Sequence, residues 1–146
     1  MTSAPGPAEI ARLHELLATL PEAADVEPGS ASAFAFAARS ALQLGRPDDA
    51  IVLGRAALTL APDNAPAWTA VGDGLWSLGQ VHDARVAYET AIGLDDKDLT
   101  TALACARAQH RDGALEAARA LLNFVLLKSR SIDITKAAAE LRETLS

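Results

Sequence analysis

Residues 65–98 decide the fold, and they read APAWTAVGDGLWSLGQVHDARVAYETAIGLDDKD. The glycine near the middle of this stretch recurs every 34 residues, at Gly45, Gly79 and Gly113. An alanine follows five residues after each of these glycines, at Ala50, Ala84 and Ala118. Features that keep the same phase over three segments indicate internal repeats. The sequence therefore predicts repeat units at 31–64, 65–98 and 99–132.

The residue types within these units resemble those of the tetratricopeptide-repeat (TPR) family. The second unit carries the family's pattern most completely, at Trp68, Val71-Gly72, Leu75, Gly79, Ala84, Tyr88, Ala91 and Leu94. The resemblance implies an all-α TPR solenoid of three helix-turn-helix repeats, with an N-terminal amphipathic helix and a C-terminal capping helix. We expect the repeat helices at about 32–44, 48–60, 65–78, 82–94, 98–111 and 114–128.

Each feature of the pattern has a physical reason. Small residues such as Gly72 allow helices to approach closely, and large ones such as Trp68 and Tyr88 fill the gaps that remain. The repeated glycines fall where the first helix of each unit ends, because a left-handed backbone is least costly for glycine. Asn64 and Asp98 precede helices and are expected to cap them.

The two ends of the chain lie outside the repeats. Residues 1–30 are expected to form a helix and a linker, with an apolar stripe at Ile10, Leu13, Leu17 and Leu20. This helix either packs on the first repeat or pairs two copies of the protein as a homodimer. Residues 133–146 are expected to form a capping helix that begins after Ser131 or Asp133 and carries Ile134, Ala138, Leu141 and Leu145.

Composition excludes several kinds of partner. The chain has 146 residues and a formal net charge of −6, and its basic residues are scattered. Nucleic acids and anionic membrane surfaces both require clustered positive charge, so neither is an expected partner. The single cysteine and the lack of a signal peptide or a long apolar span favour a soluble cytoplasmic protein.

No constellation of residues predicts catalysis, a cofactor or a metal. His14, His82 and His110 lack metal-ligand spacing. Cys105 holds a repeat-core position, which indicates a buried, unreactive thiol. The segment Gly72-Asp73-Gly74 falls in mid-helix and lacks the partners of a phosphate loop. Asp95-Asp96-Lys97-Asp98 lacks the alternation of a calcium loop and is interpreted as a turn. We therefore expect a protein that is not an enzyme.

The TPR resemblance implies a concave groove lined by the first helix of each repeat. The groove positions of the family correspond here to Ala35, Phe36, Arg39, Leu42, Gln43, Thr69, Ala70, Asp73, Trp76, Ser77, Leu103, Ala104, Arg107, His110 and Arg111. Among these, Phe36, Leu42, Trp76 and Leu103 are expected to be uncovered apolar side chains that bind a partner protein. The alternative is that the N-terminal helix or the linker fills the groove.

Two narrower resemblances differ in strength. TPR co-chaperones grip acidic tails through a carboxylate clamp, but the clamp positions here hold Ala35, Arg39, Ala70, Thr100 and Ala104, so that type is not indicated. The overall layout resembles the small acidic TPR chaperones of type III secretion translocators. That resemblance implies a cytosolic chaperone that holds an extended apolar segment of a secreted translocator. The competing hypotheses are a generic scaffold or accessory subunit that binds a folded partner, and an enzyme.

Overall fold

The computed structural model describes residues 29–145, and every regular element in this range is an α-helix. The helices are α2 (Ala31–Gln43), α3 (Pro47–Leu60), α4 (Ala65–Ser77), α5 (Val81–Leu94), α6 (Leu99–Arg111), α7 (Leu115–Lys128) and α8 (Ile132–Glu143). The predicted all-α fold is confirmed, and α2–α7 begin and end within one residue of the predicted ranges. The predicted N-terminal helix lies outside the described residues.

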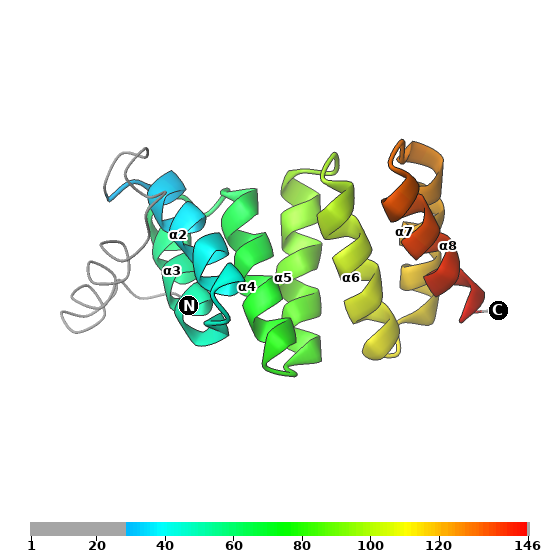
Figure 1. Ribbon diagram of the computed structural model, residues 1–146, viewed down its shortest axis with the longest axis horizontal. Helices are drawn as coiled ribbons and strands as arrows, with labels where there is room; N and C mark the ends of the chain where they lie inside the picture. The colour runs from blue at the N-terminus through cyan, green and yellow to red at the C-terminus, as the bar shows by residue number, and fades with distance from the viewer. Residues whose placement is uncertain (1–28, 146) are drawn as a thin grey trace.

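The helices form two layers along the long axis of the molecule (Figure 1). We call α2, α4 and α6 the A helices and α3, α5 and α7 the B helices. Each A helix packs on its own B helix, and each B helix packs on the helix that follows it. In addition α2 packs on α4 and α6 on α8, whereas no two B helices of the described chain make comparable contact. The middle A helices, α4 and α6, make no extensive contact with each other, and both pack on α5.

The repeated glycines end the A helices as predicted. Their φ angles are 72° at Gly45, 78° at Gly79 and 84° at Gly113, all in the left-handed region. At the end of α4 the Gly79 amide donates to the Trp76 carbonyl at 3.0 Å, and the Gln80 amide donates to the Leu75 carbonyl at 2.9 Å. This pair of bonds is the Schellman motif, which satisfies carbonyl groups that the helix end leaves free.

Polar side chains cap the helices at their starts. The predicted caps are confirmed, because Asn64 accepts from the Ala67 amide at 3.0 Å and Asp98 accepts from the Thr101 amide at 3.1 Å. The last helix is capped by Ser131, not Asp133. Ser30, which was not predicted as a cap, caps α2 and accepts from the Ala33 amide at 3.1 Å.

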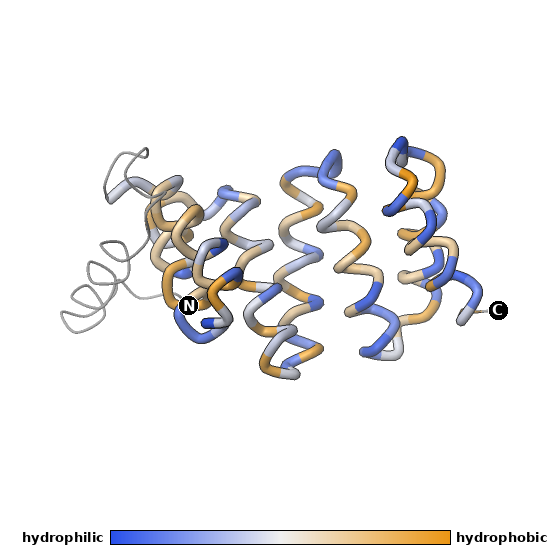
Figure 2. Tube along the Cα trace, in the orientation of Figure 1, coloured by the Kyte–Doolittle hydropathy of each residue, from blue (hydrophilic) through white to orange (hydrophobic). Residues whose placement is uncertain are grey.

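Small residues in the core allow the close packing that the sequence predicts. A Cβ atom added to Gly72 would lie 2.7 Å from the ring of Tyr88, which is 2% exposed. One core cluster joins α2–α5 with two residues of α6, and a second joins α6, α7 and α8, where Ala138 is fully buried. Figure 2 shows hydrophobic and hydrophilic colours mixed along the helices, and hydrophilic colours at the turn between α5 and α6.

Candidate functional site

The A helices expose three positions in every repeat and a fourth position on α2 and α6. On α2 the stripe holds Ser32, Phe36, Arg39 and Gln43; on α4 it holds Pro66, Asp73 and Ser77; on α6 it holds Thr100, Ala104, Arg107 and Arg111. These residues are exposed or half-buried and follow the spacing that places side chains on one side of a helix. We call this set the A-helix face.

Eight of the fifteen residues predicted for the groove lie on this face: Phe36, Arg39, Gln43, Asp73, Ser77, Ala104, Arg107 and Arg111. Half-buried His110 lies beside it in the last turn of α6.

The groove prediction needs correction at the residues that are buried. Leu103 is only 6% exposed and packs in the cluster that contains Ala138 of α8, so the C-terminal helix covers its side of α6. Leu42 and Trp76 are half-buried and pack against the first core cluster. Ala35 and Ala70, also predicted for the groove, are buried. Phe36 is half-buried as well, so Phe36, Leu42 and Trp76 all stay predicted contacts for a partner.

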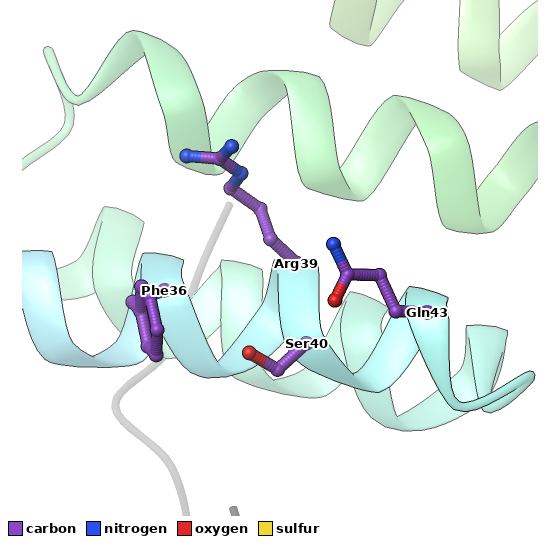
Figure 3. A pocket seen from close by; sticks show the side chains of 4 residues that line it. All are labelled: Phe36, Arg39, Ser40 and Gln43. Carbon is purple, nitrogen blue, oxygen red and sulfur yellow. The ribbon is translucent and has the colours of Figure 1, made fainter. Parts of the chain in front are cut away.

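Phe36 borders a hollow on α2. The cavity measures about 260 Å³, and its lining residues in the described chain are Phe36, Arg39, Ser40 and Gln43. Figure 3 shows Arg39 and Gln43 extending from the same side of α2, with Phe36 one turn earlier. The hollow thus combines an aromatic surface, a cationic group and an amide, which suits a side chain that is partly apolar and partly anionic.

The side chain of Asp73 on α4 contacts α5. The Tyr88 hydroxyl donates a hydrogen bond to its carboxylate. Burial raises the pKa of Asp73, the Tyr88 hydrogen bond opposes that rise, Asp98 adds to it, and the charge of Arg39 opposes it. Burial and the neighbouring Asp73 also raise the pKa of Tyr88 above its ordinary range. The phenol therefore stays protonated and acts as a permanent donor to Asp73.

Thr69, another predicted groove residue, connects two A helices. Its hydroxyl lies 3.1 Å from the hydroxyl of Thr101 on α6. The Thr101 hydroxyl donates to Asp98 at 2.6 Å, and its single proton is used there. Thr69 must then be the donor to Thr101. This chain of bonds ties α4 to α6 next to the A-helix face, so Thr69 positions the helices.

A polar cluster between α5 and α6 was missed by the sequence analysis. Arg85 donates to Glu89 at 3.2 Å and to Asp112 at 3.0 Å, and Gln109 donates to Glu89 at 3.0 Å. His82 lies 2.9 Å from the same Asp112 oxygen. The partners His82 and Arg85 lower the pKa of Asp112. These contacts join the second repeat to α6 and to the turn after it. Because the partners lie far apart in the sequence, no local sequence pattern predicts them.

Cys105 was predicted to be a buried, unreactive thiol, and its burial is confirmed. Cys105 is fully buried, and burial raises its pKa to about 12. Within residues 29–145 no group of His, Cys, Asp and Glu side chains could hold a metal ion. None of the helices described is both long enough and apolar enough to cross a membrane.

No model of a protein family matches the chain. A search of curated proteins likewise finds no match.

Solved structures, by contrast, match over most of the chain. The type III secretion chaperone SycD of Yersinia enterocolitica, in complex with a peptide of the translocator YopD, superposes with a TM-score of 0.69 at 18% identity, covering 77% of this chain and 88% of SycD. A T3SS complex from Aeromonas hydrophila gives a TM-score of 0.73 at 21% identity, covering 96% of this chain and 95% of that one.

A third match is the first TPR domain of Spaghetti (RPAP3) bound to the HSP90 peptide SRMEEVD. Its TM-score is 0.71 at 18% identity, and the match covers 82% of this chain and 98% of that domain. Identities this low establish the fold alone. The described helices have the fold of TPR domains and of SycD-like chaperones, as the sequence resemblance implies.

Proposed function

We propose that this protein is a non-catalytic binding module that holds an extended segment of a partner protein on its A-helix face. The observation that carries the proposal is the repetition of exposed positions on three successive A helices, with the hollow beside Phe36 at one end. Such a face presents side chains at regular intervals to a chain lying across it. Two of the structural matches hold peptides, the YopD peptide in SycD and SRMEEVD in RPAP3, which supports this mode of binding.

The finer proposal is a cytoplasmic chaperone that keeps a segment of a secreted translocator bound until export. It is supported by the match to the T3SS complex over nearly the whole chain and by the peptide complex of SycD. In this role Phe36 contacts an apolar side chain of the segment. Pairing of two copies through residues 7–20 is part of the same proposal, and it rests on the sequence pattern alone.

A scaffold that binds a folded partner through the B helices is the second candidate. It is favoured by exposed apolar side chains on that layer, with Leu60 56% exposed, Val86 48% and Leu94 46%. A contact of this kind would use the opposite side of the molecule. The two candidates can therefore be separated by locating the partner on the surface.

Site-specific photocrosslinking in the native cell locates it. A photoreactive amino acid replaces Gln43 or Ser77 on the A-helix face, or Thr59 or Val86 on the B helices. All four residues are exposed, so each protein should fold. We expect one partner protein to crosslink from Gln43 and Ser77 and not from the other two positions. Crosslinks from Thr59 and Val86 alone would refute the proposal and support the scaffold.

A further inference from the structure

The charges on the A-helix face differ from those of the protein as a whole. The chain carries a net charge of −6, yet the face holds three arginines, Arg39, Arg107 and Arg111, against one aspartate, Asp73. Arg111 lies in the last turn of α6, where the helix dipole alone favours a cation. Arg39 and Arg107 lie a full turn inside their helices, so the dipole does not account for them. They occupy the same position of the first and third repeats.

Neither of these two arginines has an ion-pair partner in the described chain. The arginine of the polar cluster, Arg85, is by contrast paired with Glu89 and Asp112. Asp73 lies between Arg39 and Arg107 in the repeat register, and the charge of Arg39 acts on its carboxylate, but the two groups are not within ion-pair distance. An acidic protein that leaves two mid-helix arginines without an ion pair on its A-helix face has charge complementarity for an anionic partner.

The spacing of Arg39 and Arg107 indicates how far apart two acidic residues of the partner segment should be. Packed helices lie about 8–10 Å apart. Because α2 packs on α4, and α4 approaches α6 at the Thr69–Thr101 hydroxyl contact, we take Arg39 and Arg107 to be about 20 Å apart along the face. An extended chain advances about 3.3 Å per residue, and about six residues therefore span that distance. The hollow at Phe36 and Arg39 places an apolar contact beside the first arginine.

We propose that the bound segment is an internal stretch of a protein with two acidic side chains about six residues apart, one contacting Arg39 and one contacting Arg107, and an apolar residue next to the first. This inference rests on the proposed function, since it specifies the occupant of the same face. It differs from recognition of an acidic chain end, because two separated side-chain carboxylates make the contacts and the terminal carboxylate makes none.

The test is a selection of phage-displayed random 12-residue peptides on the full chain. We expect the selected peptides to contain two acidic residues at the predicted separation. Synthetic copies should lose at least tenfold in affinity when both acids become amides, and should bind more weakly as salt rises. Amidation of the peptide C-terminus should leave affinity unchanged. Selected peptides without acids, or a strong effect of C-terminal amidation, would overturn the inference.

Variants of the protein separate this inference from the proposed function. The double variant Arg39→Gln, Arg107→Gln should lose at least tenfold in affinity, whereas the control Arg55→Gln, Lys128→Gln on the B helices should bind as wild type does. If Phe36→Ala abolishes binding and the Arg39, Arg107 variant does not, the inference fails and the proposed function stands. If no peptide is selected, or if Phe36→Ala and the arginine variants all bind normally, the proposed function itself fails.

Discussion

Replacing Gly72 by alanine tests how the repeats pack. The added Cβ would lie 2.7, 2.8 and 3.1 Å from three atoms of the Tyr88 ring. That ring cannot move aside easily, because it is 2% exposed and its hydroxyl is bonded to Asp73. Overpacking of this kind costs about 1–3 kcal/mol. Replacing a mid-helix glycine by alanine returns about 1 kcal/mol through helix propensity.

Gly93 provides the matched control. It also lies in a helix, but a Cβ added there meets no atom within 4 Å. Gly93→Ala should therefore gain only the higher helix propensity of alanine, which stabilises the protein by up to about 1 kcal/mol. We expect Gly72→Ala to be less stable than Gly93→Ala by about 2 kcal/mol. This difference is the cost of overpacking, because both variants gain helix propensity.

Urea denaturation of both variants and the wild type, followed by far-ultraviolet circular dichroism, measures this difference. The midpoint should fall for Gly72→Ala and rise for Gly93→Ala, with similar slopes. Equal midpoints for the two variants would refute the reasoning, because they would show that the contact between α4 and α5 has room for a methyl group.

Three further predictions concern the helix end, the buried carboxylate and the N-terminal helix. Gly79→Ala should lower stability by about 1–2 kcal/mol in urea denaturation, because the left-handed φ of 78° is strained for alanine although the space is open; an unchanged midpoint would contradict this. Tyr88→Phe should cost about 1–3 kcal/mol at pH 7, because it leaves the Asp73 carboxylate without its donor. The folded-state pKa of Asp73 is raised, so its ionisation weakens the fold as pH rises from the unfolded value through the folded one. Tyr88→Phe raises that pKa further, and its loss should be smaller at pH 4 than at pH 7; equal losses at both would contradict the assignment. Leu13→Asp, Leu17→Asp should convert a dimer to a monomer in analytical ultracentrifugation if the N-terminal helix pairs two copies, and an unchanged dimer would place the interface elsewhere.

The features that the sequence predicted correctly depend on local signals. The glycine that ends each A helix and the polar residue that precedes α4 or α6 act within one turn of the chain. Gly72 was predicted to allow close packing and Tyr88 to fill a gap, and the structure places the Tyr88 ring against Gly72. Such signals specify helix bounds and pairing without reference to distant residues.

The errors and omissions depend on contacts between distant segments. Leu103 was expected to be uncovered, but α8 packs on α6, and a three-repeat pattern does not indicate where the last helix lies. The bond between His82 and Asp112 joins residues 30 positions apart. The sequence also did not predict which groove positions are exposed, because some of them, such as Leu103, are buried in this structure.

The most direct test of the binding proposal is nuclear magnetic resonance of the isotopically labelled protein with the partner segment found by crosslinking. We predict that the largest amide and side-chain shift changes fall on α2, α4 and α6, at Phe36, Arg39 and Arg107 above all. The outer positions of α3, α5 and α7 should change little. Shifts concentrated on those B helices, with the A-helix face unchanged, would contradict the claim that the A-helix face holds the partner.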